Sequence, residues 1–230
     1  MREYHIRVAR AARYDVLGPE AGSRVREIWY VLHGYGQLAS TFVRLFEPVD
    51  DGTRLIVAPE ALNRFYMVDV ATAPAAERPV GATWMTREDR LNEIEDYVAY
   101  LDAVAAEVQS RVPPGSTPRV VLLGFSQGGA TAARWAALGK LRPTDVVLWG
   151  ALLPPDLDLM ASEQPLREAS LHIVIGARDR FVIDSRIADE ERRLRRGALA
   201  YDLVRYDGGH GIGRGALVEL ARRLGGTPNE

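Results

Sequence analysis

The sequence carries a series of short, continuous apolar runs that are separated by stretches with helical periodicity. A continuous apolar run of this length is typical of a strand that is buried on both faces of a sheet. Five clear runs and a weaker sixth occupy residues 28–32, 55–58, 120–123, 146–149, 171–175 and 203–206. Helices are predicted between them over about residues 87–110, 127–138, 184–195 and 213–224. Strands that alternate with helices predict an α/β fold with a mostly parallel central sheet and helices on both faces.

The length of 230 residues suits one large domain, residues 1–230, with a substantial core. Residues 4–17 predict two short strands or a single bent one before the first buried run. Thr86 and Asp89 have the spacing of a capping box at the start of the long helix. Residues 60–86 are rich in apolar side chains, and we expect them to form a rim or lid-like segment beside one edge of the sheet.

Composition excludes several classes of partner and site. The 29 basic and 31 acidic residues give a net charge of −2 without a sustained basic block, so we expect no nucleic-acid partner. The chain has no cysteine, which excludes disulfides, thiolate metal sites and a cysteine nucleophile, and suits a reducing compartment. The amino terminus lacks the apolar core of a signal peptide, and no apolar stretch is long enough to span a bilayer. We therefore expect a soluble, cytoplasmic protein without integral membrane association.

One serine is placed among glycines at the junction of a predicted strand and a predicted helix, in the segment GFSQGG at residues 124–129. In parallel sheets ligands bind beyond the carboxyl ends of the strands, which is where this segment lies. The pattern G-x-S-x-G between strand and helix is typical of a nucleophile elbow, in which a strained backbone lifts the serine hydroxyl clear of the sheet. By itself the segment also fits a plain tight turn or an anion-binding loop. The strand–turn–helix context favours Ser126 as a nucleophile.

A serine nucleophile needs a general base, and the sequence offers four histidines. His5 and His172 fall within predicted strands, and His33 belongs to the glycine-rich segment LHGYG. His210 lies in a glycine-rich loop after the last predicted strand, from which an imidazole can reach the rim of the sheet. His210 is therefore the predicted base.

The acid that orients the base is expected in a rim loop between the serine and the histidine, because this architecture orders its catalytic residues as Ser, Asp or Glu, His. Asp179 follows the predicted strand at 171–175 directly and is the predicted orienting acid. Asp184 is a rival that is better explained as the N-cap of the next helix. Asp156 and Asp158, after the preceding strand, are weaker alternatives.

Two backbone amides are expected to form an oxyanion hole, since donors aimed at the developing negative charge are a large part of such catalysis. One is the N–H of Gln127, the residue after the nucleophile. The other is the N–H of Tyr35 in the segment LHGYG, which follows the first buried run.

Four segments resemble those of α/β-hydrolases, and more narrowly those of the phospholipase/carboxylesterase family, which includes bacterial carboxylesterases and acyl-protein thioesterases. They are LHGYG at 32–36, GFSQGG at 124–129, GARDRFV at 176–182 and YDGGHGI at 206–212. The resemblance implies the same roles for the serine, aspartate, histidine and two amides named above. The chain departs from acyl-protein thioesterases at residues 58–61, where Ala-Pro-Glu-Ala replaces a Pro-Asn-Ala-Pro-like segment, and over residues 63–84. These departures concern the substrate and not the chemistry.

Apolar side chains near the rim predict an acyl pocket, because ligand sites are mostly apolar with a few polar anchors. The substrate-binding candidates are Phe65, Trp84, Leu152 and Phe181. Phe42 and Met67 are interpreted as core residues. Arg64 and Arg178 are candidates for contact with an anionic head group, although single arginines are usually only solvated.

These observations predict a serine hydrolase that cleaves a carboxylic ester of a small molecule through an acyl-enzyme, as a carboxylesterase, a lysophospholipase or a thioesterase. Amide or peptide hydrolysis by the same residues is the alternative, and a non-catalytic binding module with the hydrolase fold is a third hypothesis. No cofactor is expected, and the few histidines suggest no metal-binding cluster, so no metal is expected either. The sequence leaves open the acyl chain length, the head group and the choice between a monomer and a homodimer.

Overall fold

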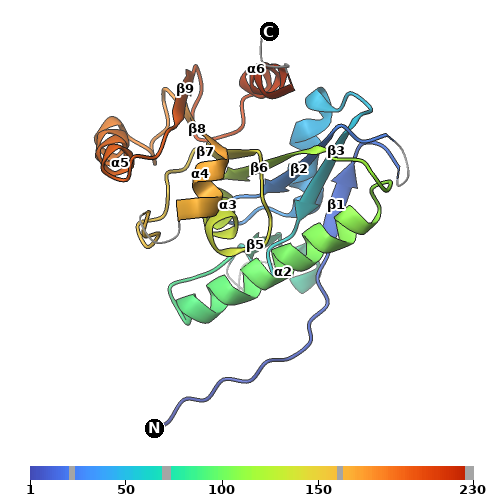
Figure 1. Ribbon diagram of the computed structural model, residues 1–230. Helices are drawn as coiled ribbons and strands as arrows, with labels where there is room; N and C mark the ends of the chain where they lie inside the picture. The colour runs from blue at the N-terminus through green and yellow to red at the C-terminus, as the bar shows by residue number, and fades with distance from the viewer. Residues whose placement is uncertain (21–23, 69–73, 160–162, 226–230) are drawn as a thin grey trace.

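A seven-stranded sheet forms the centre of the computed structural model, which describes residues 1–20, 24–68, 74–159 and 163–225 (Figure 1). The strand order is β1-β3-β2-β6-β7-β8-β9; β1 is antiparallel to β3, and the other neighbours run parallel. The bounds are β1 Tyr14–Leu17, β2 Glu27–Leu32, β3 Arg54–Pro59, β6 Arg119–Phe125, β7 Asp145–Trp149, β8 Ser170–Gly176 and β9 Asp202–Tyr206. Each predicted apolar run forms a parallel strand, so the predicted α/β fold is confirmed.

Helices cover both faces of this sheet (Figure 1). The longer ones are α2 Arg90–Ser110, α3 Gln127–Leu138, α5 Asp184–Arg196 and α6 Arg214–Gly225. The shorter ones are α1 Ala39–Phe42, the 3-10 helices η1 Val43–Val49 and η2 Ala75–Glu77, and α4 Glu163–Glu168. Along β2 the side chains alternate between two cores: Tyr30 belongs to the core under α2 and α3, and Trp29 to the core under η1 and α6. Because both faces of β2 are buried, its sequence is apolar almost throughout.

The amino-terminal segment differs from the prediction. Within residues 1–20 the strand is confined to β1 at the edge of the sheet, and residues 1–13 form neither helix nor strand. Arg7 donates hydrogen bonds to Glu95 (2.6 Å) and Asp96 (3.1 Å) of α2. No strand of the described residues pairs with this segment, so polar side chains tie it to α2 in place of a backbone ladder.

The start of α2 is a second correction, because the predicted capping box does not form. Asp89 has a left-handed backbone (φ 47°) and makes no side-chain cap hydrogen bond. Its carboxylate accepts the side-chain amide of Asn92 (2.8 Å), while the Thr86 hydroxyl accepts the N–H of Glu88 (3.1 Å). Both side chains are therefore engaged outside the pairing that a capping box requires.

Residues 60–86 contain a small antiparallel sheet of β4 Asn63–Tyr66 and β5 Val80–Thr83. Residues 69–73 of this segment lie outside the described residues. The N–H of Gly36 donates to the carbonyl of Ala82 (2.9 Å), so β5 borders the loop that follows β2. The segment thus lies at the carboxyl end of the main sheet.

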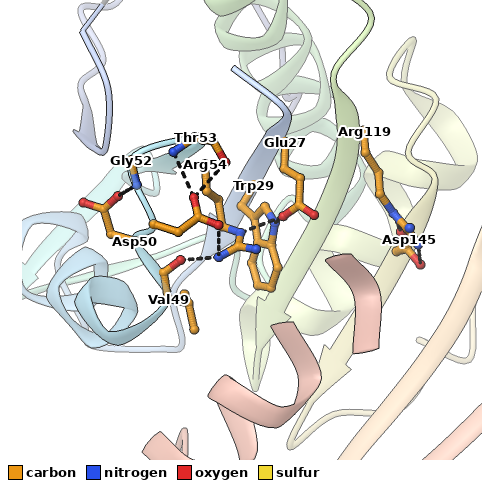
Figure 2. A network of polar contacts seen from close by, with 10 residues as sticks. Glu27, Trp29, Val49, Asp50, Gly52, Thr53, Arg54, Arg119 and Asp145 are labelled. Atoms are coloured by element: carbon orange, nitrogen blue, oxygen red, sulfur yellow. Dashed lines mark hydrogen bonds and ion pairs between the residues drawn. The ribbon is translucent and has the colours of Figure 1, made fainter. Parts of the chain in front are cut away.

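Buried charged side chains gather at the amino ends of the parallel strands (Figure 2). Glu27 of β2 accepts hydrogen bonds from Arg54 of β3 (2.6 Å) and from the indole of Trp29 (2.8 Å). Arg119 of β6 donates two hydrogen bonds to Asp145 of β7 (2.7 and 2.9 Å). Each pair joins two neighbouring strands, so the charges at this end of the sheet satisfy one another.

Candidate active site

Ser126 stands in the turn between β6 and α3 with a backbone conformation that few residues adopt. Its φ and ψ are 53° and −117°, which is a strained combination for a residue with a side chain. A Cβ at Gly124 would lie 2.1 Å from the carbonyl oxygen of Gly128, and a Cβ at Gly128 would lie 2.2 Å from that of Leu32. Glycine at both positions therefore lets α3 start directly against the ends of β6 and β2, with the serine beyond the carboxyl end of the sheet.

The structure brings Ser126, His210 and Asp179 together at this end. The Ser126 hydroxyl lies 2.9 Å from His210 Nε2, and His210 Nδ1 lies 2.7 Å from Asp179 Oδ2. With the ring proton on Nδ1 and donated to the carboxylate, Nε2 can accept the serine proton. The three side chains form a continuous chain of hydrogen bonds from a hydroxyl to a buried carboxylate.

Asp179 is held by amides of its own loop. Its side chain is 1% exposed, and its Oδ1 accepts the N–H groups of Phe181 (2.8 Å) and Val182 (3.1 Å). Burial alone would raise the pKa of this carboxyl, but the hydrogen bonds from His210 and from the two amides hold the pKa below its usual value. Asp179 therefore stays ionised, and its charge can stabilise an imidazolium on His210.

The loop that carries His210 is packed in place. A Cβ at Gly176 would lie 2.4 Å from the carbonyl oxygen of Gly209, so the loop rests directly on the end of β8. The imidazole lies against the rings of Phe125 and Phe181, with centroids 5.0 and 4.6 Å away. These contacts fix the direction of the ring as well as its position.

The rival residues from the sequence lie elsewhere. Asp184 is the first residue of α5 and not its N-cap, since the residue before it, which has an extended backbone, takes the cap position. The carboxylate of Asp184 accepts a hydrogen bond from Arg205 (2.6 Å). Asp156 accepts two hydrogen bonds from Arg134 (3.0 and 2.7 Å). His172 contacts an aspartate at the amino end of the sheet. Of the acids weighed in the sequence, Asp179 is the one that contacts His210.

His33 fixes the peptide that carries the Tyr35 amide. Its Nε2 accepts the N–H of Ala61 (3.0 Å), so its proton is on Nδ1, which donates to the carbonyl of Gly34 (2.8 Å). Because the C=O and N–H of a trans peptide point in opposite directions, the Tyr35 N–H is directed away from His33. Burial lowers the pKa of His33, which keeps the ring neutral in this role.

The amides of Tyr35 and Gln127 are placed as donors beside the serine. Within the described ranges, no protein acceptor takes up either N–H. Gln127 is the first residue of α3, where backbone N–H groups point out of the positive end of the helix. Tyr35 lines the same cavity as Ser126. The arrangement can therefore offer two hydrogen bonds to an anionic oxygen.

The side chain of Gln127 fastens α3 to the end of β5. Its Nε2 donates to the carbonyl of Met85 (2.8 Å), and its Oε1 accepts the N–H of Trp84 (3.1 Å). Trp84 is 1% exposed, and its indole donates to the carbonyl of His33 (2.8 Å). The expectation that Trp84 contacts substrate is corrected, because its ring is turned into the core and supports the Tyr35 loop from behind.

A cavity of about 630 Å³ opens beside the serine and the histidine. Its lining residues are Gly34, Tyr35, Gln37, Phe125, Ser126, Ala130, Arg134, residues 150–155, Phe181, Val182, Arg186 and His210. Leu152 and Phe181, two of the substrate-binding candidates, belong to this lining. Phe65 does not belong to it; its ring packs against that of Tyr35 at a centroid distance of 5.1 Å.

The cavity is also lined by two arginines that the sequence did not single out, Arg134 and Arg186. Arg134 follows Ser126 by eight residues, and positions four apart share one face of a helix, so the spacing could have identified it. Arg186 carries no comparable signal, because its place depends on how α5 packs. Arg64 and Arg178 were the sequence candidates; both pair with carboxylates and lie outside the cavity lining.

The remaining expectations concern the core, metals and membranes. Phe42 lies in the core as interpreted, whereas Met67 is 52% exposed because it follows the end of β4. In the part of the chain that the structure describes, no three His, Cys, Asp or Glu side chains are grouped so that they could hold a metal ion. Among the described helices, none combines the length and the apolar character that crossing a bilayer requires.

Several solved structures resemble this chain over nearly its whole length. Acyl-protein thioesterase 2 of Zea mays has a TM-score of 0.69 at 17% identity, covering 93% of this chain and 98% of that one. A carboxylesterase from Mesorhizobium loti has a TM-score of 0.68 at 21% identity, covering 94% and 95%. The Bacillus cereus carboxylesterase has a TM-score of 0.65 at 14% identity, covering 92% of each chain. At these identities the likeness establishes the α/β-hydrolase fold.

Comparison of the sequence with protein families gives a more specific result. No curated protein sequence matches this chain. The family model described as Serine hydrolase (FSH1) matches residues 29–217, a span that includes Tyr35, Ser126, Asp179 and His210. The chain therefore belongs to the FSH1 family of serine hydrolases and shares its fold with carboxylesterases and thioesterases.

Proposed function

We propose that this serine hydrolase cleaves carboxylic esters of small molecules through a covalent acyl-enzyme. The observation that carries the proposal is the chain of hydrogen bonds from Ser126 through His210 to Asp179. Ser126 Oγ attacks the ester carbonyl while His210 Nε2 takes its proton, and His210 then gives that proton to the departing alcohol. Water attacks the acyl-enzyme in the same way, with His210 as base, and the acid leaves as Ser126 recovers its proton.

The Tyr35 and Gln127 amides would hold the negative charge of the two tetrahedral intermediates. One such donor is worth about 3–4 kcal/mol of transition-state stabilisation. Two contacts support this role, since His33 holds the Gly34 carbonyl and the Gln127 side chain ties α3 to β5. The donors are therefore positioned by bonds that do not involve the substrate.

The cavity and the structural neighbours support a small ester as the substrate. A cavity of about 630 Å³ with apolar side chains such as Leu152 and Phe181 lies within the usual range for small-molecule sites. Two of the neighbours are carboxylesterases and one is an acyl-protein thioesterase, so oxygen esters and thioesters are both included in the proposal. Every step uses groups of this chain and water, without a cofactor.

Labelling with a fluorophosphonate tests the nucleophile. We expect one adduct, on the peptide that contains Ser126, together with hydrolysis of short p-nitrophenyl esters. Ser126→Ala should remove both signals, whereas Ser110→Ala, at the exposed end of α2, should change neither. Folded protein that carries no adduct on Ser126 would refute the proposal.

A second measurement separates ester from amide hydrolysis. A p-nitrophenyl ester and a p-nitroanilide with the same acyl group are compared at equal concentration. The proposal expects turnover of the ester and no measurable release of nitroaniline. Turnover of the anilide at a rate comparable to that of the ester would transfer the assignment to amide hydrolysis.

A further inference from the structure

The charges that face the cavity beside Ser126 are all of one sign. Apart from the catalytic imidazole, the charged members of its lining are the two guanidinium groups of Arg134 and Arg186, and no carboxylate of the described residues is among the lining. Asp179, which lies behind His210, is buried and hydrogen bonded. A substrate in this cavity therefore meets apolar walls and two positive groups.

Arg186 reaches the cavity from the first turn of α5 with most of its donors available. One N–H of its guanidinium, on Nη1, donates to the carbonyl of Phe181 (2.9 Å), the residue whose ring lies on His210. No carboxylate of the described residues pairs with Arg186. The acidic neighbours on α5 are already taken by other arginines: Asp184–Arg205, Asp189–Arg192 and Glu190–Arg193.

Arg134 is the second positive group of the lining. It lies eight residues after Ser126, about 12 Å along the axis of α3, and its guanidinium donates to both carboxylate oxygens of Asp156. The same carboxylate also pairs with Arg90 (2.7 Å). Two cations thus share one anion, which leaves one positive charge in excess at this end. Hydrogen bonds from Arg134 hold the pKa of Asp156 far below its usual value, so this balance persists at neutral pH.

We infer that this cavity binds an ester that carries a second, anionic group, a carboxylate or a phosphate, and that Arg186 is the residue that binds this group. The inference rests on the proposed ester hydrolysis and names its substrate class. Guanidinium groups match the oxygens of carboxylates and phosphates with paired hydrogen bonds. The excess charge at Arg134 and Arg90 attracts the same anion over a longer range.

The test compares esters that differ in one charge. The p-nitrophenyl half-ester of glutaric acid places a carboxylate on the acyl side, and p-nitrophenyl pentanoate is its neutral partner of equal chain length. Acyl glycerol phosphate and acyl glycerol form the corresponding pair on the alcohol side. We expect kcat/KM at least tenfold higher for the anionic member of one pair, chiefly through KM, and a decline of this preference as salt is added.

Arg186→Gln should reduce that anionic-to-neutral ratio about tenfold. Arg192→Gln is the matched control: it lies on the same helix and pairs with Asp189, and it is not part of the cavity lining, so the ratio should stay that of the wild type. Which pair shows the preference decides between an anionic acyl group and an anionic alcohol.

A binding measurement keeps this inference separate from the proposed function. Ser126→Ala protein, which cannot form the acyl-enzyme, is titrated with glutarate and with glycerol phosphate by calorimetry, with and without Arg186→Gln. Binding that Arg186→Gln weakens tenfold supports the inference even if no tested ester is hydrolysed. If labelling and turnover occur but neither anion binds and both members of each pair react equally, the inference is wrong and the proposed function stands.

Discussion

Each end of the parallel sheet holds an aspartate in contact with a histidine, and the surroundings of the two pairs differ. At the amino end, His172 Nε2 lies 3.2 Å from Asp145, which also takes two hydrogen bonds from Arg119. At the carboxyl end, His210 lies 2.7 Å from Asp179, whose other oxygen is held by two backbone amides. A cation neutralises the first carboxylate, whereas the second keeps its charge for the imidazole.

The second ring nitrogen of each histidine completes the contrast. His172 Nδ1 has no hydrogen-bond partner among the described residues. His210 Nε2 faces the hydroxyl of Ser126, whose backbone is strained and whose side chain borders the cavity. An aspartate–histidine contact is thus not a catalytic signature by itself; the strained serine, the free amides and the open cavity distinguish one end from the other.

Asp179→Asn should have the largest effect on activity. The amide cannot stabilise the imidazolium and favours the wrong ring tautomer, so we expect kcat for a p-nitrophenyl ester to fall about 10⁴-fold. The melting temperature should change much less than the activity does. Steady-state kinetics measures the loss, and a decrease below tenfold would mean that Asp179 does not orient the base.

Asp145→Asn should reduce stability and leave the activity nearly unchanged. It breaks a buried ion pair and should lower the free energy of unfolding by about 3 kcal/mol, the low end for such pairs because Arg119 keeps 32% of its side chain exposed. Urea unfolding measures this change. Ester hydrolysis well below the unfolding transition should stay within about twofold of the wild type. A loss of activity as large as that of Asp179→Asn would remove the distinction between the two ends.

Two glycine substitutions compare the ends through packing. A Cβ at Gly128 would lie 2.2 Å from the carbonyl oxygen of Leu32, and a Cβ at Gly18 (φ 113°) would lie 2.2 Å from that of Arg54. Either glycine-to-alanine change should cost about 1–3 kcal/mol of stability, as overpacking does. Only Gly128→Ala should also reduce kcat, because it displaces the serine turn. Equal kcat in the two variants, measured where both are folded, would contradict this.

The two ends of the sheet should differ least in their effect on acid stability, since protonation of Asp145 and of Asp179 should destabilise the fold in the same direction. Burial would raise the pKa of Asp145, but hydrogen bonds from His172 and Arg119 hold it below its usual value, as the contacts of Asp179 do for that group. A carboxyl whose folded pKa is depressed stabilises the fold above its unfolded value of about 3.9, and this contribution is lost as the pH falls through the folded pKa.

We therefore expect the contribution of these two carboxylates to the free energy of unfolding to be constant above about pH 5 and to decline below about pH 4. The decline should amount to about 1.4 kcal/mol for each tenfold difference in proton affinity between the folded and the unfolded carboxyl. Asp145→Asn and Asp179→Asn should each make this decline shallower. Urea titrations at a series of pH values provide the measurement. A decline as steep as that of the wild type in both variants would show that neither group is linked to folding.

The sequence was sufficient to predict the sheet, because strands buried on both faces leave short, continuous apolar runs that alternate with helical periodicity. It failed for residues 4–13, where the alternation of Tyr4, Ile6 and Val8 with polar residues resembles a strand but pairs with no strand of the described residues. A backbone ladder depends on a neighbour that local sequence does not reveal.

The candidate site likewise contains residues that the sequence could identify and residues that it could not. Ser126 and His210 could be singled out because each lies in a glycine-rich turn, and Asp179 because it directly follows a predicted strand and lies between them in the chain. Only part of the cavity lining could be predicted, namely Leu152 and Phe181, since the rest depends on side-chain direction in three dimensions. Trp84 turns inward although its segment lies on the rim, and Arg186 enters from a helix whose packing no motif specifies.

The bond from His33 to the Gly34 carbonyl has a consequence for how the enzyme meets its substrate. A neutral ring joins the N–H of Ala61 to that carbonyl, so it links the first turn of chain after β3 to the peptide that carries the Tyr35 amide. A second proton on His33 would abolish the contact with Ala61 and free the peptide to rotate. In the proposed mechanism, the direction of the Tyr35 amide thus depends on a ring that is not part of the cavity lining.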